Sequence, residues 1–201
     1  VFAGGIQKPS LLSMKLDKRG LLFLGKIGLK RLSGGDDYLL KLVIKIFEDE
    51  GFKVNSVQEI APSLLSPRGV LRKYSPSKAE LEDIDVGNEV LANLGSMDVG
   101  QSVIVENGTV LGIEAAEGTD ALIQRSQNLK KEKKGVGVLV KRLKFSQDVR
   151  VDLPTIGIKT LEMVHQSGLS GIAVGAKESL ILDKKSVINF ANKHKLFIVG
   201  I

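Results

Sequence analysis

The final part of the sequence alternates short apolar runs with segments that have a helical pattern. Residues 171–201, "GIAVGAKESLILDKKSVINFANKHKLFIVGI", read in order as strand, strand, helix and strand. Strands that are interleaved with helices of this length predict an α/β fold. Because 43% of the 201 residues are apolar, the chain can also bury a packed core.

Earlier segments continue this alternation. Helical patterns cover residues 36–50, 77 to about 93, 118–126 and 160–166. Strand patterns cover residues 53–57, both arms of a hairpin within 102–115, and residues 135–142. Ser77 and Glu80 have the spacing of a capping box, and Asn107-Gly108 tolerates the positive φ of a type I′ turn. These local signals mark where the predicted elements begin and end.

A segment with several Ser and Pro residues, between residues 61 and 74, predicts a linker. We therefore expect two lobes. Residues 1–70 would form an incomplete, Rossmann-like N-terminal α/β lobe, residues 71–76 the linker, and residues 77–201 a C-terminal catalytic α/β lobe with a mixed sheet. Because "VFAGG" reads as a strand end followed by a glycine turn, we also expect further residues upstream of Val1.

Charge and composition narrow the function classes. A net charge of +6 indicates an anionic partner, but 4% aromatic residues and no Trp argue against single-stranded nucleic acid. The absence of Cys excludes disulfides and thiolate chemistry and favours a reducing compartment. No apolar run approaches the length of a membrane span. We therefore expect a cytoplasmic protein that does not bind nucleic acid.

The segment "KFSQDVRVDLPTIG", residues 144–157, places three charged side chains at alternate positions. If this segment is a strand, Asp148, Arg150 and Asp152 all face one side of its sheet. Basic residues Lys141, Arg142 and Lys144 lie just before them. One interpretation is a phosphate and metal site held between buried flanks, and the other is an ordinary edge strand protected by charge.

Acidic residues stand at the ends of several other predicted elements: Asp36, Asp37, Asp98, Glu114, Glu117 and Asp120. Carboxylate oxygens are suitable Mg²⁺ ligands. However, Asp36, Thr119 and Asp120 also occupy positions typical of helix N-caps, and Glu114 is interpreted as a solvated residue on a hairpin. Both interpretations remain open at this point.

Two further features have ordinary structural explanations. Gly4-Gly5, with Lys8 behind them, can bring backbone N–H groups close to a phosphate, but a plain turn explains the pair equally. His165 and His194 fall on predicted helices without a Ser or carboxylate placed to form a triad. We interpret both histidines as structural or surface residues.

Several segments together carry a family resemblance: "VFAGGIQKPS", "GGDDYLL", "APSLLSPRGVL", "LGSMDVGQSVIVENGTVLGIEAAEGTDALIQR" and "GVLVKRLKFSQDVRVDLPTIG". In this order they resemble the UDP-2,3-diacylglucosamine pyrophosphatases of the LpxI type over the whole chain. The "EGTDA" and "QDVRVDLPTIG" segments are the most specific. The resemblance implies Mg²⁺-dependent hydrolysis of UDP-2,3-diacylglucosamine to 2,3-diacylglucosamine 1-phosphate (lipid X) and UMP, in lipid A biosynthesis of Gram-negative bacteria.

The resemblance also implies roles for individual residues. The essential aspartate of the family's "DLP" motif falls on Asp152, the predicted catalytic residue. Asp120, Asp148 and Asp152 are the predicted Mg²⁺ ligands. The predicted substrate and phosphate contacts are Gly4, Gly5, Lys8, Asp98, Gln101, Thr119, Lys141, Arg142, Lys144, Gln147 and Arg150. A lipid substrate adds peripheral contact with the inner membrane as an expectation, and a homodimer is left open.

A different function class remains as an alternative. The family's first βα unit, which has its own glycine-rich turn, does not occur in this sequence. If that absence is real in the living protein, the chain would be a truncated, non-catalytic remnant that binds the acyl-sugar phosphate or a nucleotide sugar. A third alternative is a nucleotide-sugar binding or regulatory protein.

Overall fold

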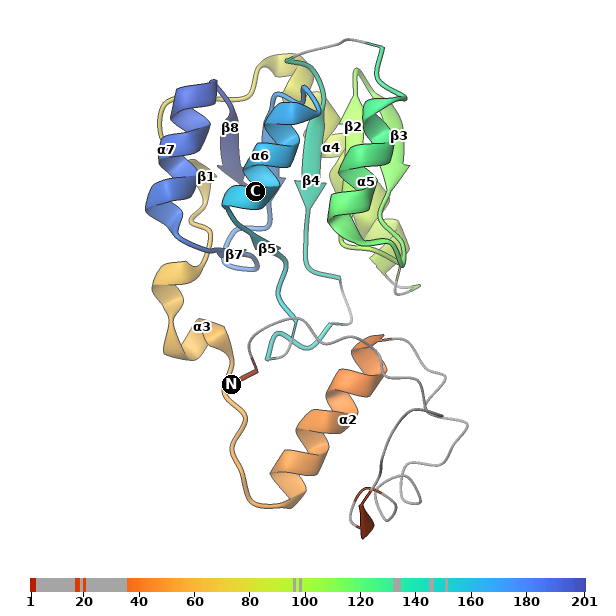
Figure 1. Cartoon of the computed structure of the whole chain (residues 1–201), viewed down its shortest axis with the longest axis vertical. Helices are drawn as coiled ribbons and strands as arrows, with labels where there is room; N and C mark the ends of the chain where they lie inside the picture. The colour runs from red at the N-terminus through yellow and green to blue at the C-terminus, as the bar shows by residue number, and fades with distance from the viewer. Residues whose placement is uncertain are drawn as a thin grey trace.

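The computed structural model describes residues 1–2, 17–18, 20, 36–95, 97, 99–131, 135–144, 147–150 and 152–201. Figure 1 shows an upper lobe built on a sheet and a lower part that contains helix α2. The described helices and strands alternate in the upper lobe, which confirms the predicted mixed α/β fold class. No helix within the described residues is long and apolar enough to cross a membrane.

The sheet of the upper lobe has six strands in the order β1-β8-β6-β4-β2-β3. Strands β4, β6 and β8 are parallel, whereas β3, β2 and β1 each pair in antiparallel fashion. Their bounds are β1 Gly69–Val70, β2 Ser102–Glu106, β3 Thr109–Ile113, β4 Val138–Lys141, β6 Gly171–Val174 and β8 Phe197–Gly200. A separate parallel pair joins β5 Thr155–Ile156 to β7 Leu180–Ile181.

Two hydrophobic cores lie on opposite faces of this sheet, because side chains alternate along each strand. On β4, Leu139 packs into one core while Val138 and Val140 pack into the other. The first core is covered by helices α5 Gly118–Gln127, α6 Ile158–Gln166 and α7 Lys184–His194, and the second by α4 Lys78–Gly95. The upper lobe therefore has three layers (Figure 1).

The predicted starts of two elements are confirmed. Ser77 and Glu80 form the capping box of α4: each backbone N–H donates to the other's side chain, at 2.6 and 3.4 Å. Asn107 and Gly108 adopt positive φ angles of 48° and 73° in the turn between β2 and β3. Asp83 of α4 accepts hydrogen bonds from both turn N–H groups, at 3.0 and 2.6 Å. This buried carboxylate therefore fixes the hairpin against α4.

The predicted helix in the first lobe is confirmed as α2, Asp36–Asp49. The predicted strand over residues 53–57 is wrong, because residues 52–56 have no regular structure and α3, Val57–Ile60, begins at its last residue. Ser56 and Glu59 form a capping box there, with N–H to side-chain distances of 3.2 and 3.3 Å. That local signal outweighs the β-branched residues of the segment.

The connection between the lobes consists of the 3₁₀ helix η3, Pro62–Leu64, an isolated bridge from Leu65 to Leu180, and strand β1. Strand β1 pairs with β8 at one edge of the large sheet. The chain therefore already contributes to the upper lobe at residues 69–70, just before the expected linker at 71–76. The exact division into lobes stays a prediction.

Candidate active site

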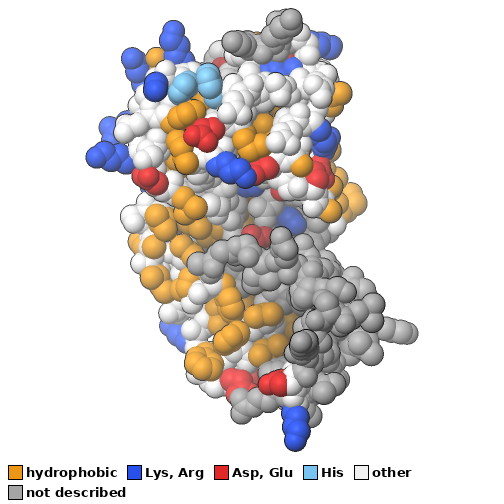
Figure 2. Space-filling view, in the orientation of Figure 1, with side chains coloured by type: hydrophobic (Ala, Val, Ile, Leu, Met, Phe, Trp, Pro, Cys, Tyr) orange, Lys and Arg blue, Asp and Glu red, His pale blue; other side chains and the backbone are white. Residues whose placement is uncertain are grey.

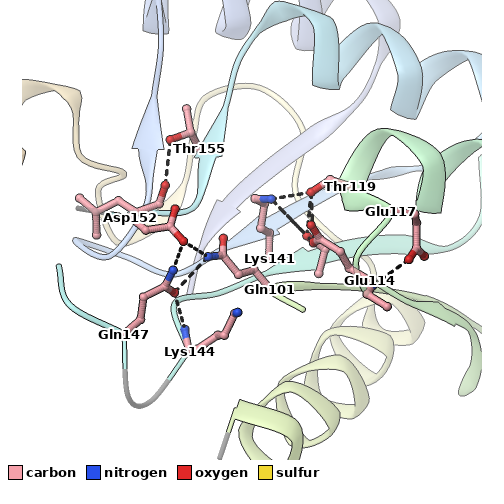
Figure 3. Close-up of polar contacts among 12 residues, drawn as sticks. Gln101, Glu114, Glu117, Thr119, Lys141, Lys144, Gln147, Asp152 and Thr155 are labelled. Carbon is pink, nitrogen blue, oxygen red and sulfur yellow. Dashed lines mark hydrogen bonds and ion pairs between the residues drawn. The ribbon is translucent and has the colours of Figure 1, made fainter. Parts of the chain in front are cut away.

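Several chain segments meet at one end of the strands of the large sheet, where the inner strand β4 finishes. Strand β4 ends at Lys141, which lies opposite Ser102 at the start of antiparallel β2. Strand β3 ends opposite Val103, so Glu114 follows at the same edge. Helix α5 begins close by and contributes Thr119. Figure 3 shows the side chains from these segments gathered in one place.

The first group of contacts surrounds Lys141. Its Nζ lies 2.6 Å from Thr119 Oγ1, 3.3 Å from Ser102 Oγ and 4.0 Å from a carboxylate oxygen of Glu114. Thr119 Oγ1 in turn donates to Glu114 at 3.1 Å. The Lys141 side chain is only 8% exposed, so its ammonium has exchanged water for these partners.

Burial and neighbouring charges have opposite effects on the pKa of Lys141. Burial holds the pKa of Lys141 below its usual value, and the charges of Glu114, Asp152 and Asp120 oppose that shift. These neighbouring carboxylates favour the charged form of the Lys141 side chain against the effect of its burial.

The second group surrounds Asp152. Gln101 Nε2 donates to Asp152 Oδ2 at 2.9 Å, and Gln147 Nε2 donates to the same oxygen. The Gln147 amide oxygen accepts from Gln101 at 3.0 Å and from the backbone N–H of Lys144 at 3.3 Å. The Gln147 amide is therefore fixed in orientation, and it fixes the Asp152 carboxylate in turn.

The two groups are neighbours because Gln101 and Ser102 are consecutive residues. Gln101 binds Asp152, and Ser102 contacts Lys141 and Thr119. Figure 3 shows the amide of Gln101 between the two groups. The carboxylate of Asp152, the ammonium of Lys141 and the hydroxyl of Thr119 therefore lie in two adjoining groups.

The expectation that Asp148, Arg150 and Asp152 share the face of one strand is wrong. Residues 149–150 form a turn, and no strand is present in the described residues from 147 to 154. Asp148 accepts from the Arg150 backbone N–H at 2.9 Å and from its guanidinium at 2.7–3.2 Å. A side chain that binds the backbone two residues later favours a turn over an extended strand.

This turn is directed toward the lower lobe. Arg150 Nη1 donates to Glu48 of α2 at 2.7 Å. The Arg150 guanidinium holds the pKa of Asp148 below its usual value, and the carboxylates in turn raise the pKa of Arg150. Asp148 and Arg150 thus act as a pair that connects the two lobes.

The remaining predicted residues lie in different surroundings. Asp120 forms an ion pair with Lys159 of α6 at 2.6 Å, and its side chain is 49% exposed. Arg142 contacts Glu178 at 3.3 Å. Arg142 and Lys144 line a cavity of about 260 Å³. Gly4, Gly5, Lys8 and Asp98 lie outside the described residues.

The three predicted metal ligands are not brought together. Asp120 pairs with Lys159 and Asp148 with Arg150, while Asp152 binds the two glutamine amides. Among the residues with a described placement, no group of three or more His, Asp or Glu side chains could hold a metal ion. Both Asp152 and Asp120 act on the charge of Lys141, and of these two Asp152 is the one held by glutamine amides.

Glu114 and Ser102 were not predicted to take part. A signal for Glu114 was present, because it directly follows the second arm of a hairpin whose first arm begins with Gln101 and Ser102. The two histidines lie together on the surface of the upper lobe (Figure 2). His165 Nε2 and His194 Nδ1 are 3.0 Å apart, away from the groups described above.

The fold and the polar residues at the end of β4 define the class of protein. It is a two-lobed α/β protein with a polar site where parallel strand β4 ends. Ligands of open α/β sheets bind outside the carboxyl ends of the strands. A buried ammonium at such a position is suited to an anionic group such as a phosphate.

Comparison with known proteins places the chain more closely. Residues 1–64 match the LpxI N-terminal domain, and residues 67–199 match the LpxI C-terminal domain. UDP-2,3-diacylglucosamine pyrophosphatase LpxI of Caulobacter vibrioides is 38% identical over 205 residues, which cover the whole of this chain and 73% of that protein. The chain belongs to the LpxI family, as the resemblance in its sequence implied.

Proposed function

We propose that the protein hydrolyses the pyrophosphate bond of UDP-2,3-diacylglucosamine, releasing lipid X and UMP. Membership of the LpxI family and the name of the relative from Caulobacter vibrioides support this activity. The observation that carries the proposal is the Asp152 carboxylate, held by two glutamine amides beside the buried ammonium of Lys141. This arrangement supports a role in positioning water next to a phosphate group.

In the proposed reaction, Asp152 orients a water molecule and accepts its proton. The water oxygen bonds to one phosphorus while the bond from that phosphorus to the bridging oxygen breaks. The amides of Gln101 and Gln147 keep the carboxylate in one direction, so little reorganisation is needed when the proton moves. Lys141 offsets the negative charge on the phosphate oxygens, and Thr119 accepts from Lys141 at 2.6 Å.

A Mg²⁺ requirement is part of the proposal. Mg²⁺ usually takes one or two carboxylates together with substrate phosphates, so a single carboxylate beside a phosphate site fits this ion. Asp152 would hold it, because Asp120 and Asp148 are engaged with Lys159 and Arg150. The ion would supply charge neutralisation on the pyrophosphate.

The substrate's two acyl chains suggest where the protein works. We extend the proposal to a cytoplasmic enzyme that meets its substrate by peripheral contact with the inner membrane. The net charge of +6 is consistent with attraction to an anionic lipid surface. Co-sedimentation with vesicles that contain anionic lipid, compared with neutral vesicles, tests this contact.

The direct test is release of UMP from UDP-2,3-diacylglucosamine by the purified protein. The proposal predicts stoichiometric formation of UMP and lipid X. Binding of lipid X without any release of UMP would instead support a non-catalytic binding protein.

A further inference from the structure

The Glu114 carboxylate belongs to the first group of site residues and contacts both the Thr119 hydroxyl, at 3.1 Å, and the Lys141 ammonium, at 4.0 Å (Figure 3). Its side chain is 13% exposed, although it directly follows a hairpin strand. A carboxylate at this depth has exchanged most of its water for protein partners. Its partners therefore indicate what it does.

Proton counting fixes the direction of each contact. The ammonium of Lys141 can only donate, and an ionised Glu114 can only accept. Thr119 therefore accepts from Lys141 at 2.6 Å and gives its single proton to Glu114 at 3.1 Å. Ser102, which is 3.2 Å from Thr119, must then be the donor in that contact. All four side chains hold one another in a single arrangement.

The charges around Lys141 also indicate a role for Glu114. Three carboxylates act on Lys141 from three segments: Glu114 after β3, Asp120 in α5 and Asp152 before β5. The effect of Glu114 is the largest of the three. Asp152 and Asp120 are otherwise bound to Gln101 and Lys159, respectively. Glu114 is thus the main counter-charge that offsets the burial of the ammonium.

We propose that Glu114 is a positioning residue for the hydrolysis: it orients the Thr119 hydroxyl, which accepts from Lys141, and it places a carboxylate 4.0 Å from the Lys141 ammonium. Glu114 acts through these two side chains and does not touch the reacting atoms. The role rests on the proposed function, since that function gives Lys141 its task at the phosphates.

The chain offers a matched control three residues later. Glu117 lies in the same connection between β3 and α5, but it binds Arg125 at 2.9 and 3.1 Å and the backbone N–H of Ala115 at 3.2 Å. Its charge is paired with Arg125 at 2.9 Å, and its hydrogen-bond partners are Arg125 and Ala115. Glu117→Gln therefore removes a carboxylate nearby without touching the proposed network.

The first experiment compares the pH dependence of kcat for wild type, Glu114→Gln and Glu117→Gln. We expect Glu114→Gln to lower kcat by about 10- to 100-fold. This is the usual loss when a residue that orients the ligands of a metal site is replaced. Its activity should also be lost at lower pH on the alkaline side, because Lys141 gives up its proton more easily. Glu117→Gln should match wild type. A Glu114→Gln profile of unchanged shape would overturn the proposal.

A second experiment needs no activity. NMR observation of the Lys141 side-chain nitrogen, identified by its absence in Lys141→Met, follows its titration directly. The Lys141 titration should move to lower pH in Glu114→Gln and stay in place in Glu117→Gln. An unmoved titration in Glu114→Gln would contradict the role of Glu114. If the wild-type protein lacked pyrophosphatase activity, the proposed function would fail while this contact would still be tested.

A third arm separates positioning from simple stabilisation. Thr119→Val removes the hydroxyl at nearly constant size, so Glu114 loses one of its two contacts with the site and keeps the one with Lys141 at 4.0 Å. The loss of kcat caused by Glu114→Gln should then be smaller in the Thr119→Val background than in wild type, because residues of one network are not additive. Fully independent losses in the double variant would show that Glu114 does not act through Thr119.

Discussion

Arg150 and Glu48 form an ion pair between segments that are 102 residues apart in the chain, with 2.7 Å between Nη1 and Oε1. Glu48 belongs to α2 of the lower lobe, whereas Arg150 lies in the turn that leads to Asp152. The turn that precedes the predicted catalytic carboxylate is therefore attached to the other lobe. Movement between the lobes would be transmitted to it.

This ion pair should contribute little to stability. The Arg150 side chain is 35% exposed and that of Glu48 is 43% exposed, so water screens their attraction. We expect Glu48→Gln to lower the free energy of unfolding by about 0.2–1 kcal/mol at low salt and by less at high salt. Urea unfolding under both conditions measures this. A loss well above that range would mean that the pair does more than connect two surfaces.

Replacing Asp152 should stop the chemistry while leaving the fold intact. Asp152→Asn keeps the size of the side chain but cannot accept a proton from water, so we expect turnover to fall about a hundredfold or more. The melting temperature and lipid X affinity should change little. Exposed Asp85 of α4 provides the control, since Asp85→Asn should behave as wild type. A stable Asp152→Asn protein with near-normal turnover would remove Asp152 from the catalytic role.

Removal of divalent metal tests the proposed Mg²⁺ requirement. Loss of a charge-neutralising ion at a pyrophosphate typically costs several kcal/mol, or about a hundredfold or more in rate. UMP release should therefore fall by that order in excess chelator and recover when Mg²⁺ is restored. Equal rates with and without chelator would exclude the metal requirement.

Helix α4 packs so closely on the sheet that Gly87 has no room for a side chain. A Cβ at this position would lie 2.6 Å from Val140 Cγ2 and 3.0 Å from Val140 Cβ. We expect Gly87→Ala to destabilise the protein by about 1–3 kcal/mol, the usual cost of overpacking a core. Adding Val140→Ala should recover part of the loss. If denaturant unfolding found the single variant as stable as wild type, the close contact would be refuted.

The histidine pair should make the upper lobe sensitive to acid. Burial, then the neighbouring His165, holds the pKa of His194 below its ordinary value of 6.5. A lowered pKa means that the folded state favours the neutral ring of His194. The contribution of His194 to the free energy of unfolding is therefore present above pH 6.5 and is lost as the pH falls through the folded pKa. His194→Gln should therefore lose less melting temperature on acidification than wild type. Equal losses would exclude the pair as the cause.

The sequence predicted elements whose ends carry strong local signals. The capping box of α4 and the Asn107-Gly108 turn act over three or four residues, so they can be read without the rest of the fold. Two predicted strands failed for the same kind of reason. At residues 53–57 the Ser56 cap begins a helix, and at Asp148 a side chain binds the backbone of Arg150. Local hydrogen bonds there outweigh alternation.

The candidate site could be predicted only in part. The family resemblance supplied Asp152, Gln101, Gln147, Thr119 and Lys141, and these residues do lie in two adjoining groups. Glu114 was missed because a charged residue after a hairpin strand normally faces water. Its place after the hairpin was visible in the sequence, but its burial was not, because strand pairing and the start of α5 bring distant segments over it.

The pairing of Ser102 with Lys141 across β2 and β4 has a further consequence. Side chains on a strand alternate between its two faces, so a slip of one residue would replace Ser102 by Gln101 or Val103 beside the ammonium. Asp152 would then lose an amide donor at the same moment that Lys141 lost a hydroxyl. Molecules in which β2 pairs with β4 in a shifted register would thus be inactive even if they were compact. The specific activity of a preparation would therefore measure the fraction of molecules with the correct register.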